Sequence, residues 1–121
     1  MTTSILVWLD SSPFNRPQAR EALDYALAMA AVEHQVQLLL TGPAVLLLLP
    51  HKDIASRLQL KDMSKAIGLF ELYDIAAPIV TEPDLALYQL TADALAYDVR
   101  VLSTGQLHSQ LPHYQHIVRF S

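Results

Sequence analysis

The chain alternates short, mostly apolar runs with segments of helical periodicity or polar turns. The apolar runs cover residues 4–9, 36–41, 75–81, 99–104 and 116–120. The run at residues 4–9 is nearly continuous, which is typical of a parallel strand buried on both faces, and parallel strands need crossover segments that helices usually provide. We therefore predict an α/β fold: a single domain over residues 1–121, with a mostly parallel sheet of about five strands and helices on both faces.

Two longer segments have apolar residues at the spacing of an amphipathic helix. The first is predicted to start near Asn15, because Pro17 and Gln18 fit the first turn of a helix. Its apolar stripe consists of Ala19, Ala22, Leu23, Ala26, Leu27 and Ala30. The second is predicted to start near Asp62, with a stripe of Met63, Ala66, Ile67, Phe70 and Tyr73. Each stripe would face the sheet, and shorter helical segments are expected within residues 82–90 and 105–114.

The chain has more apolar surface than one small core requires. Hydrophobic residues make up 52% of its 121 residues and charged residues only 17%, against roughly 25% charged in a typical soluble domain. The segment that follows Pro43 is apolar on every side of a helix, and Leu69 and Leu72 fall outside the stripe of the second helix. We therefore expect contact with other chains, with a candidate interface made of Val45, Leu46, Leu47, Leu48, Leu49, Leu69, Leu72 and Tyr73.

Charge and cysteine content exclude several classes of function. The net charge is -4 and no basic run is present, so direct nucleic-acid binding is not expected. The chain has no cysteine, which excludes disulfides, thiolate metal sites and persulfide chemistry on this polypeptide. The first residues do not resemble a signal peptide, and the most apolar window, 13 residues with Thr41, Gly42 and Pro43 inside it, is too short to span a membrane. We expect a cytoplasmic protein.

Polar side chains follow the first predicted strand, where a parallel α/β sheet commonly places its site. They include Asp10, Ser11, Ser12, Arg16 and Arg20. A dehalogenase-type phosphatase would have a second aspartate at position 12, so that function is not favoured. Hydroxyls, arginines and a helix N-terminus could hold a small anion, but ordinary capping and surface pairing explain the same residues.

Other signatures of catalysis, cofactor binding or metal binding are missing from the sequence. The three glycines stand far apart, and no serine lies in a G-x-S-x-G turn, which disfavours dinucleotide binding and serine hydrolysis. His108, His113 and His116 lie five and three residues apart, with no cysteine or acidic residue near them, so no metal site is predicted. Glu82 fits a helix start better than a general base. We predict no catalytic residue, cofactor or metal.

Several segments, taken in order, resemble one known family. They are "SSPFNRPQAREALDYALA", "LLPHKDIASR", "AIGLFELYDI" and the terminal "HIVRF". Together they cover nearly the whole chain and resemble the DsrE/DsrF-like family, within it the TusC (DsrF-type) subunits. None of them is a catalytic signature, so the resemblance rests on their combined order.

This resemblance implies a subunit of a sulfur relay. TusC-like subunits assemble with TusB-like and TusD-like subunits as a dimer of heterotrimers, and sulfur travels from TusA-like to TusE-like carriers for 2-thiouridine synthesis at the tRNA wobble position. The carrier cysteine of TusD-like subunits maps near Val80 or Thr81 here. Because every carrier must present a thiol, the resemblance implies a degenerate carrier position and a non-catalytic subunit. The alternatives are a DsrF-like subunit of a sulfur-oxidation complex and a small anion-binding or ligand-binding α/β protein.

Overall fold

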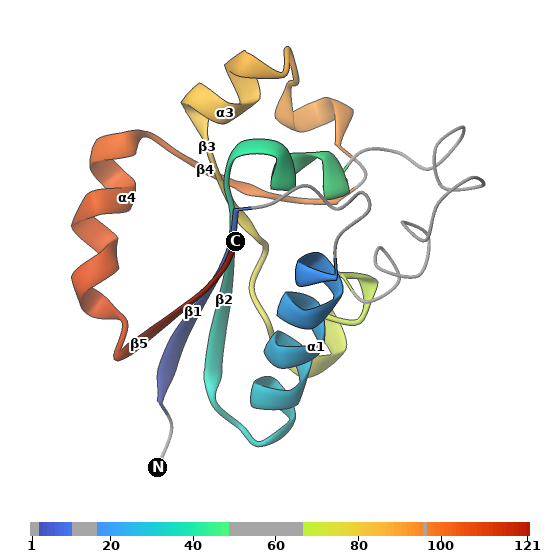
Figure 1. The fold of residues 1–121 in the computed structure, drawn as a ribbon, viewed down its shortest axis with the longest axis vertical. Coiled ribbons are helices and arrows are strands. Elements are labelled where there is room, and N and C mark those ends of the chain that lie inside the picture. Colours follow the sequence, from blue (N-terminus) through green and yellow to red (C-terminus); the bar gives the residue numbers. More distant parts are fainter. Residues whose placement is uncertain (1–2, 11–16, 49–66, 96) are drawn as a thin grey trace.

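A computed structural model describes residues 3–10, 17–48, 67–95 and 97–121. Its described part contains a five-stranded sheet in which all neighbouring strands are parallel (Figure 1). The strands are β1 (Ser4–Leu9), β2 (Gln35–Leu40), β3 (Ile79–Thr81), β4 (Arg100–Leu102) and β5 (His116–Phe120), in the spatial order β4-β3-β2-β1-β5. The predicted α/β class is therefore confirmed.

Helices cover both faces of this sheet, as predicted. The helix α1 (Gln18–Ala31) packs on one face and α4 (Thr104–Gln110) lies on the other (Figure 1). The segment that contains α4 carries the chain from the edge strand β4 to the opposite edge, where β5 pairs with β1. The remaining helical segments are η1 (Gly42–Leu48), η2 (Glu71–Tyr73), α3 (Glu82–Leu87), η3 (Ala92–Ala94) and η4 (Leu111–His113).

Alternation along the strands builds two apolar cores. Ile5, Val7 and Leu9 of β1 belong to the larger core on the α1 side, whereas Leu6 belongs to a smaller core on the α4 side. The smaller core also contains Leu39, Ile79, Leu102 and Leu107, with Trp8, Leu111 and Tyr114 packed against it. Burial raises the pKa of the Tyr114 hydroxyl, and the nearby positive charge of Arg100 acts in the opposite direction.

The first predicted helix is confirmed together with most of its stripe. Four of its six stripe residues are buried, and three of these are alanines: Ala19, Ala22, Leu23 and Ala26. Alanines let the helix backbone approach the sheet closely, because they leave little side chain between the two layers. Leu27 and Ala30 pack at the margin of the same core. Of the second predicted helix, residues 62–66 lie outside the described part, while Ile67 and Phe70 are buried as expected.

Two strands are shorter than the sequence predicts, for identifiable reasons. The run at residues 75–81 pairs as a strand only from Ile79 onward, because Pro78 has no N–H to donate and the side chain of Gln37 donates to the carbonyl of Ala77 (2.8 Å). Strand β4 ends at Leu102 because Ser103 and Gln106 cap each other's backbone at the start of α4. Among the described residues, no helix is long and apolar enough to cross a membrane.

Candidate functional site

The carboxyl end of β3 contains no thiol, and its two last residues have structural roles. Val80 is fully buried in the larger core. Thr81 is the N-cap of α3: its Oγ1 accepts from the backbone N–H of Asp84 (3.4 Å) and donates to the Asp84 carboxylate (2.7 Å). This pairing holds the helix start, which is the ordinary role of threonine at this position. Glu82 is exposed in the first turn.

The chemistry available at this strand end is therefore limited. A valine has no ionisable or nucleophilic group, and a buried threonine hydroxyl that is engaged in capping is not activated by a neighbouring base in the manner of a catalytic nucleophile. The position that the resemblance assigns to a carrier cysteine thus offers packing and capping, and no atom that can accept sulfur.

A second polar cluster lies where β1, β2 and β5 end side by side. The indole Nε1 of Trp8 donates to Thr41 Oγ1 (2.7 Å), and Thr41 Oγ1 donates to the Asp10 carboxylate (3.0 Å). Arg119 forms an ion pair with the same carboxylate and stacks over the Trp8 ring, 4.6 Å from its centroid. Gly42 has a φ of 55°, and a Cβ there would lie 3.3 Å from the Asp10 carboxylate.

This cluster lies at the end of β1, where the sequence suggested a small-anion site as one alternative. In open parallel sheets a ligand commonly binds where the strand order reverses, and here that point lies between β1 and β5. The Asp10 carboxylate already neutralises Arg119 and would repel an anion. Arg20 is exposed on α1, and Ser11, Ser12 and Arg16 lie outside the described residues. The cluster therefore connects the ends of strands β1, β2 and β5.

Most apolar residues of η1 are buried, so they do not form the exposed interface surface that the sequence suggested. Val45, Leu47 and Leu48 are fully buried in the chain's own larger core, and Leu46 is partly buried. Leu49 lies outside the described residues. The all-apolar pattern of this segment is therefore satisfied within the chain, because the short helix packs across the end of the sheet near α3. Contrary to expectation, Val45, Leu47 and Leu48 have almost no surface to offer a partner in this conformation.

The other candidate interface residues are exposed together around η2. Leu69 is 41% exposed, Leu72 78% and Tyr73 42%. We call these three residues the η2 patch. Two apolar leucines and a tyrosine within five residues form a cluster of the kind enriched in protein interfaces.

The late histidines lie on surface elements and do not converge. His108 is in α4, His113 in η4 and His116 at the start of β5, and all three are exposed. Within the described ranges, no group of three or more histidine and acidic side chains could hold a metal ion.

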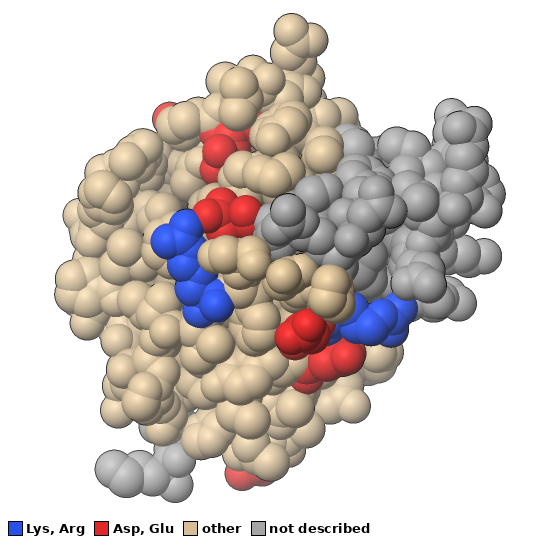
Figure 2. Space-filling view, viewed as in Figure 1, with Lys and Arg blue, Asp and Glu red and all other residues tan. Residues whose placement is uncertain are grey.

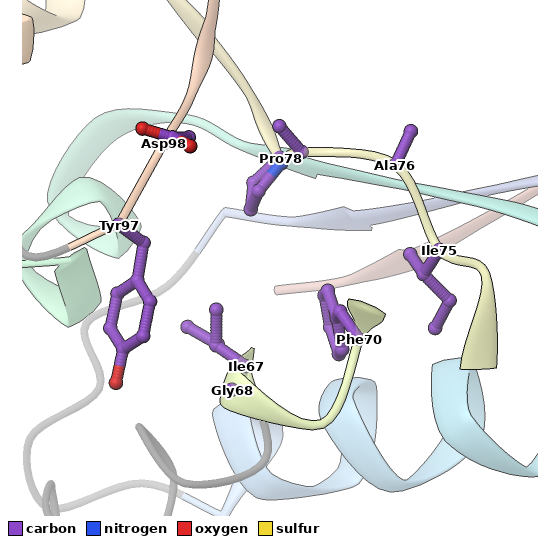
Figure 3. Close-up of a pocket in the computed structure, with 9 residues that line it drawn as sticks. Ile67, Gly68, Phe70, Ile75, Ala76, Pro78, Tyr97 and Asp98 are labelled. Atoms are coloured by element: carbon purple, nitrogen blue, oxygen red, sulfur yellow. The ribbon is translucent and has the colours of Figure 1, made fainter. Parts of the chain in front are cut away.

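A pocket that the sequence pattern does not predict lies beside the η2 patch. The pocket has a volume of about 300 Å³ and opens beside the extended segment that leads into β3 (Figure 3). Its floor is apolar, with Ile67, Phe70 and Ile75 nearly buried. Its remaining lining residues are Gly68, Ala76, Ala77, Pro78, Tyr97 and Asp98. Two segments separated by about twenty residues form it, so no local sequence motif signals it.

Comparison with known proteins assigns the chain to a family. The sequence model of the DsrE/DsrF-like family matches residues 3–120. The TusC homolog of Vibrio vulnificus strain CMCP6 is 31% identical, covering 91% of this chain and 92% of its own length, and that of Pseudomonas aeruginosa is 30% identical, covering 98% of each. The crystal structure of the ychN protein from E. coli has a TM-score of 0.79 and covers 99% of this chain and 100% of its own, at 13% identity, which supports the fold alone. The chain belongs to the DsrE/DsrF-like family.

Proposed function

We propose that this protein is a non-catalytic subunit of a sulfur-relay complex of the TusBCD type. In this role it binds TusB-like and TusD-like sister subunits in a dimer of heterotrimers, in the cytoplasm. Persulfide sulfur passes between carriers on other chains, from TusA-like to TusE-like proteins, and serves 2-thiouridine synthesis at the tRNA wobble position. The protein itself contributes its fold and its surface.

One observation carries this proposal: the strand end where a carrier thiol is expected holds a core valine and a capping threonine. A chain that keeps the family fold and lacks the nucleophile can assist sulfur transfer but cannot carry sulfur. The names of the relatives, TusC homologs, support the same role. The net charge of the sequence is -4 and no basic run occurs in it, and the basic side chains on the face that Figure 2 shows are few and apart. This supports contact with proteins and not directly with tRNA.

Two alternatives are less well supported. A DsrF-like role in sulfur oxidation uses the same type of assembly, and the partner proteins in the cell decide between the two pathways. A free anion-binding protein would use the end of β1, but there the Asp10 carboxylate pairs with Arg119. Loss of 2-thiouridine from tRNA when this protein is deleted would favour the tRNA pathway, and normal 2-thiouridine levels would contradict it.

The assembly is tested by a charge in the η2 patch. We expect Leu72→Asp to weaken or abolish co-purification with TusB-like and TusD-like chains, because an unpaired carboxylate in a dry contact costs several kcal/mol. Leu87→Asp is the matched control, since Leu87 is 70% exposed on α3, outside the patch. Both variants should fold, because both leucines lie largely in solvent. Sedimentation of the co-expressed complexes gives their mass.

The proposal predicts an equimolar complex for the wild-type chain and for Leu87→Asp. Leu72→Asp should sediment as free subunits. A wild-type chain that remains alone in the presence of both sister chains would contradict the proposed function. Normal assembly of Leu72→Asp would instead show that the interface lies on another face.

A further inference from the structure

We infer that the pocket beside the η2 patch binds one bulky apolar side chain from a basic, extended segment of a partner protein. This inference deepens the proposed function, because it names the chemistry of the partner segment at the surface where assembly is proposed. It rests on the volume, lining and charge of the pocket and on the backbone groups of Ala76 and Ala77 at its edge.

The pocket is large enough for a single side-chain anchor. Its volume is about 300 Å³, and an apolar cavity of about 150 Å³ is enough to bind benzene. Ile67, Phe70 and Ile75 supply an apolar floor that belongs to the larger core. In Figure 3, Ile67 and Phe70 lie along one side and Pro78 and Asp98 along the other, with the Tyr97 ring at one end. A leucine or phenylalanine side chain fits this lining.

The charge at the pocket selects a basic partner. Asp98 lines the pocket and Asp74 directly precedes the floor residue Ile75. Both residues are exposed, and neither carboxylate forms an ion pair with any described residue. The nearest cation in the sequence, Arg100, acts on the pKa of Tyr114, and Tyr114 packs against the smaller core on the α4 side. Two exposed carboxylates that pair with no cation of the described residues favour Lys or Arg in the segment that binds.

The backbone at the pocket edge is available to an extended segment. Residues 75–78 precede β3; the Ile75 N–H donates to the Phe70 carbonyl (2.8 Å), and the Pro78 carbonyl accepts from the Arg100 N–H (2.8 Å). The N–H and C=O of Ala76 and the N–H of Ala77 form no hydrogen bond within the described part of the chain, whereas the Ala77 carbonyl accepts from Gln37. An extended peptide that anchors one side chain in a pocket and pairs its main chain with exposed backbone is an established mode of recognition.

Binding can be measured on the full chain with short peptides as probes. We expect acetyl-Lys-Phe-Arg-amide to shift the backbone amide NMR signals of Gly68, Ala76, Ala77 and Asp98, with a Kd of about 1–10 mM for one apolar anchor and an ion pair. Acetyl-Lys-Ser-Arg-amide lacks the anchor, and acetyl-Glu-Phe-Glu-amide reverses the charge. Both comparison peptides should bind more weakly than the basic phenylalanine peptide.

Two pairs of variants separate the pocket from the rest of the surface. Gly68→Leu should abolish the response, because Gly68 lines the pocket and has open space at its Cβ position. Gly105→Leu is its control, since Gly105 has equally open surroundings on α4. Asp98→Lys should weaken binding of the basic peptide about two- to fivefold. The control Asp93→Lys, an exposed acid of η3 outside the pocket lining, should leave the binding unchanged.

The outcomes distinguish this inference from the proposed function. The inference fails if the basic peptide shifts none of the pocket amides, if the acidic peptide binds equally well, or if Gly68→Leu responds like the wild type. No sister subunit is present in this experiment. Peptide binding by a chain that does not assemble would therefore contradict the proposed function alone, and assembly without peptide binding would contradict this inference alone.

Discussion

At the scale of single residues, Thr81 caps a helix at the position where the family resemblance places a carrier cysteine. Its hydroxyl connects the end of β3 to the start of α3 by accepting from the Asp84 N–H and donating to the Asp84 carboxylate. A cysteine at such a position could accept sulfur, whereas the threonine hydroxyl caps the start of α3. The adjacent Val80 fills the core. This end of the strand therefore stabilises the fold.

Removing the Thr81 hydroxyl should affect stability and leave sulfur transfer unchanged. We expect Thr81→Ala to lower the free energy of unfolding by about 1 kcal/mol, the typical loss for an N-cap residue. Thr81→Ser keeps the hydroxyl and should cost less. Urea denaturation followed by circular dichroism measures both variants. A drop in the rate of sulfur transfer through an assembly containing Thr81→Ala, with its fold intact, would contradict the structural role.

Local sequence signals account for part of these residue-scale features. The stretch from Thr81 to Asp84 and that from Ser103 to Gln106 both have the spacing of a helix N-cap, so both helix starts can be predicted from sequence. The connection of Asp10 with Thr41 and Arg119 could not be predicted, because it joins residues at the ends of three strands whose spatial order is not evident from the sequence.

At the scale of elements, α1 depends on small side chains. Ala22 and Ala26 are fully buried against the sheet, and side chains of this size set the distance between helix and sheet. The segment η1 is apolar on all sides, and the rest of the same chain covers it. Periodicity predicted which residues of α1 are buried. Periodicity could not predict that η1 packs within its own chain, because a segment buried against a sister subunit would have the same apolar sequence pattern.

Enlarging a buried alanine of α1 should separate the two layers. We expect Ala26→Leu to lower the free energy of unfolding by about 1–3 kcal/mol, because the added carbons have no space against the sheet. Ala28→Leu is the control, since Ala28 is exposed on the same helix and leucine is nearly as good a helix former as alanine. Thermal unfolding of both variants gives the comparison. Equal stability of the two would show that α1 is not closely packed on the sheet.

At the scale of the whole molecule, the residues that stabilise the fold are separate from the proposed contact surface. Both cores and the polar cluster at the ends of β1, β2 and β5 hold the fold. The residues of the η2 patch are exposed, and the pocket lies beside them. The sequence predicted the exposed leucines of the patch from their places outside a helical stripe. It did not predict the pocket, because the pocket depends on how residues 67–78 lie against Tyr97 and Asp98.

The central claim is that this chain supports sulfur transfer without carrying sulfur. The most direct test is mass spectrometry of the complex reconstituted with TusB-like and TusD-like chains and loaded by a persulfide donor, recorded first intact and then on the separated chains. The account predicts that this chain is present in the intact complex at its unmodified mass, while a cysteine-containing sister chain gains the mass of one or more sulfur atoms. A sulfur adduct on this chain, or an assembled and loaded complex that excludes it, would contradict the account.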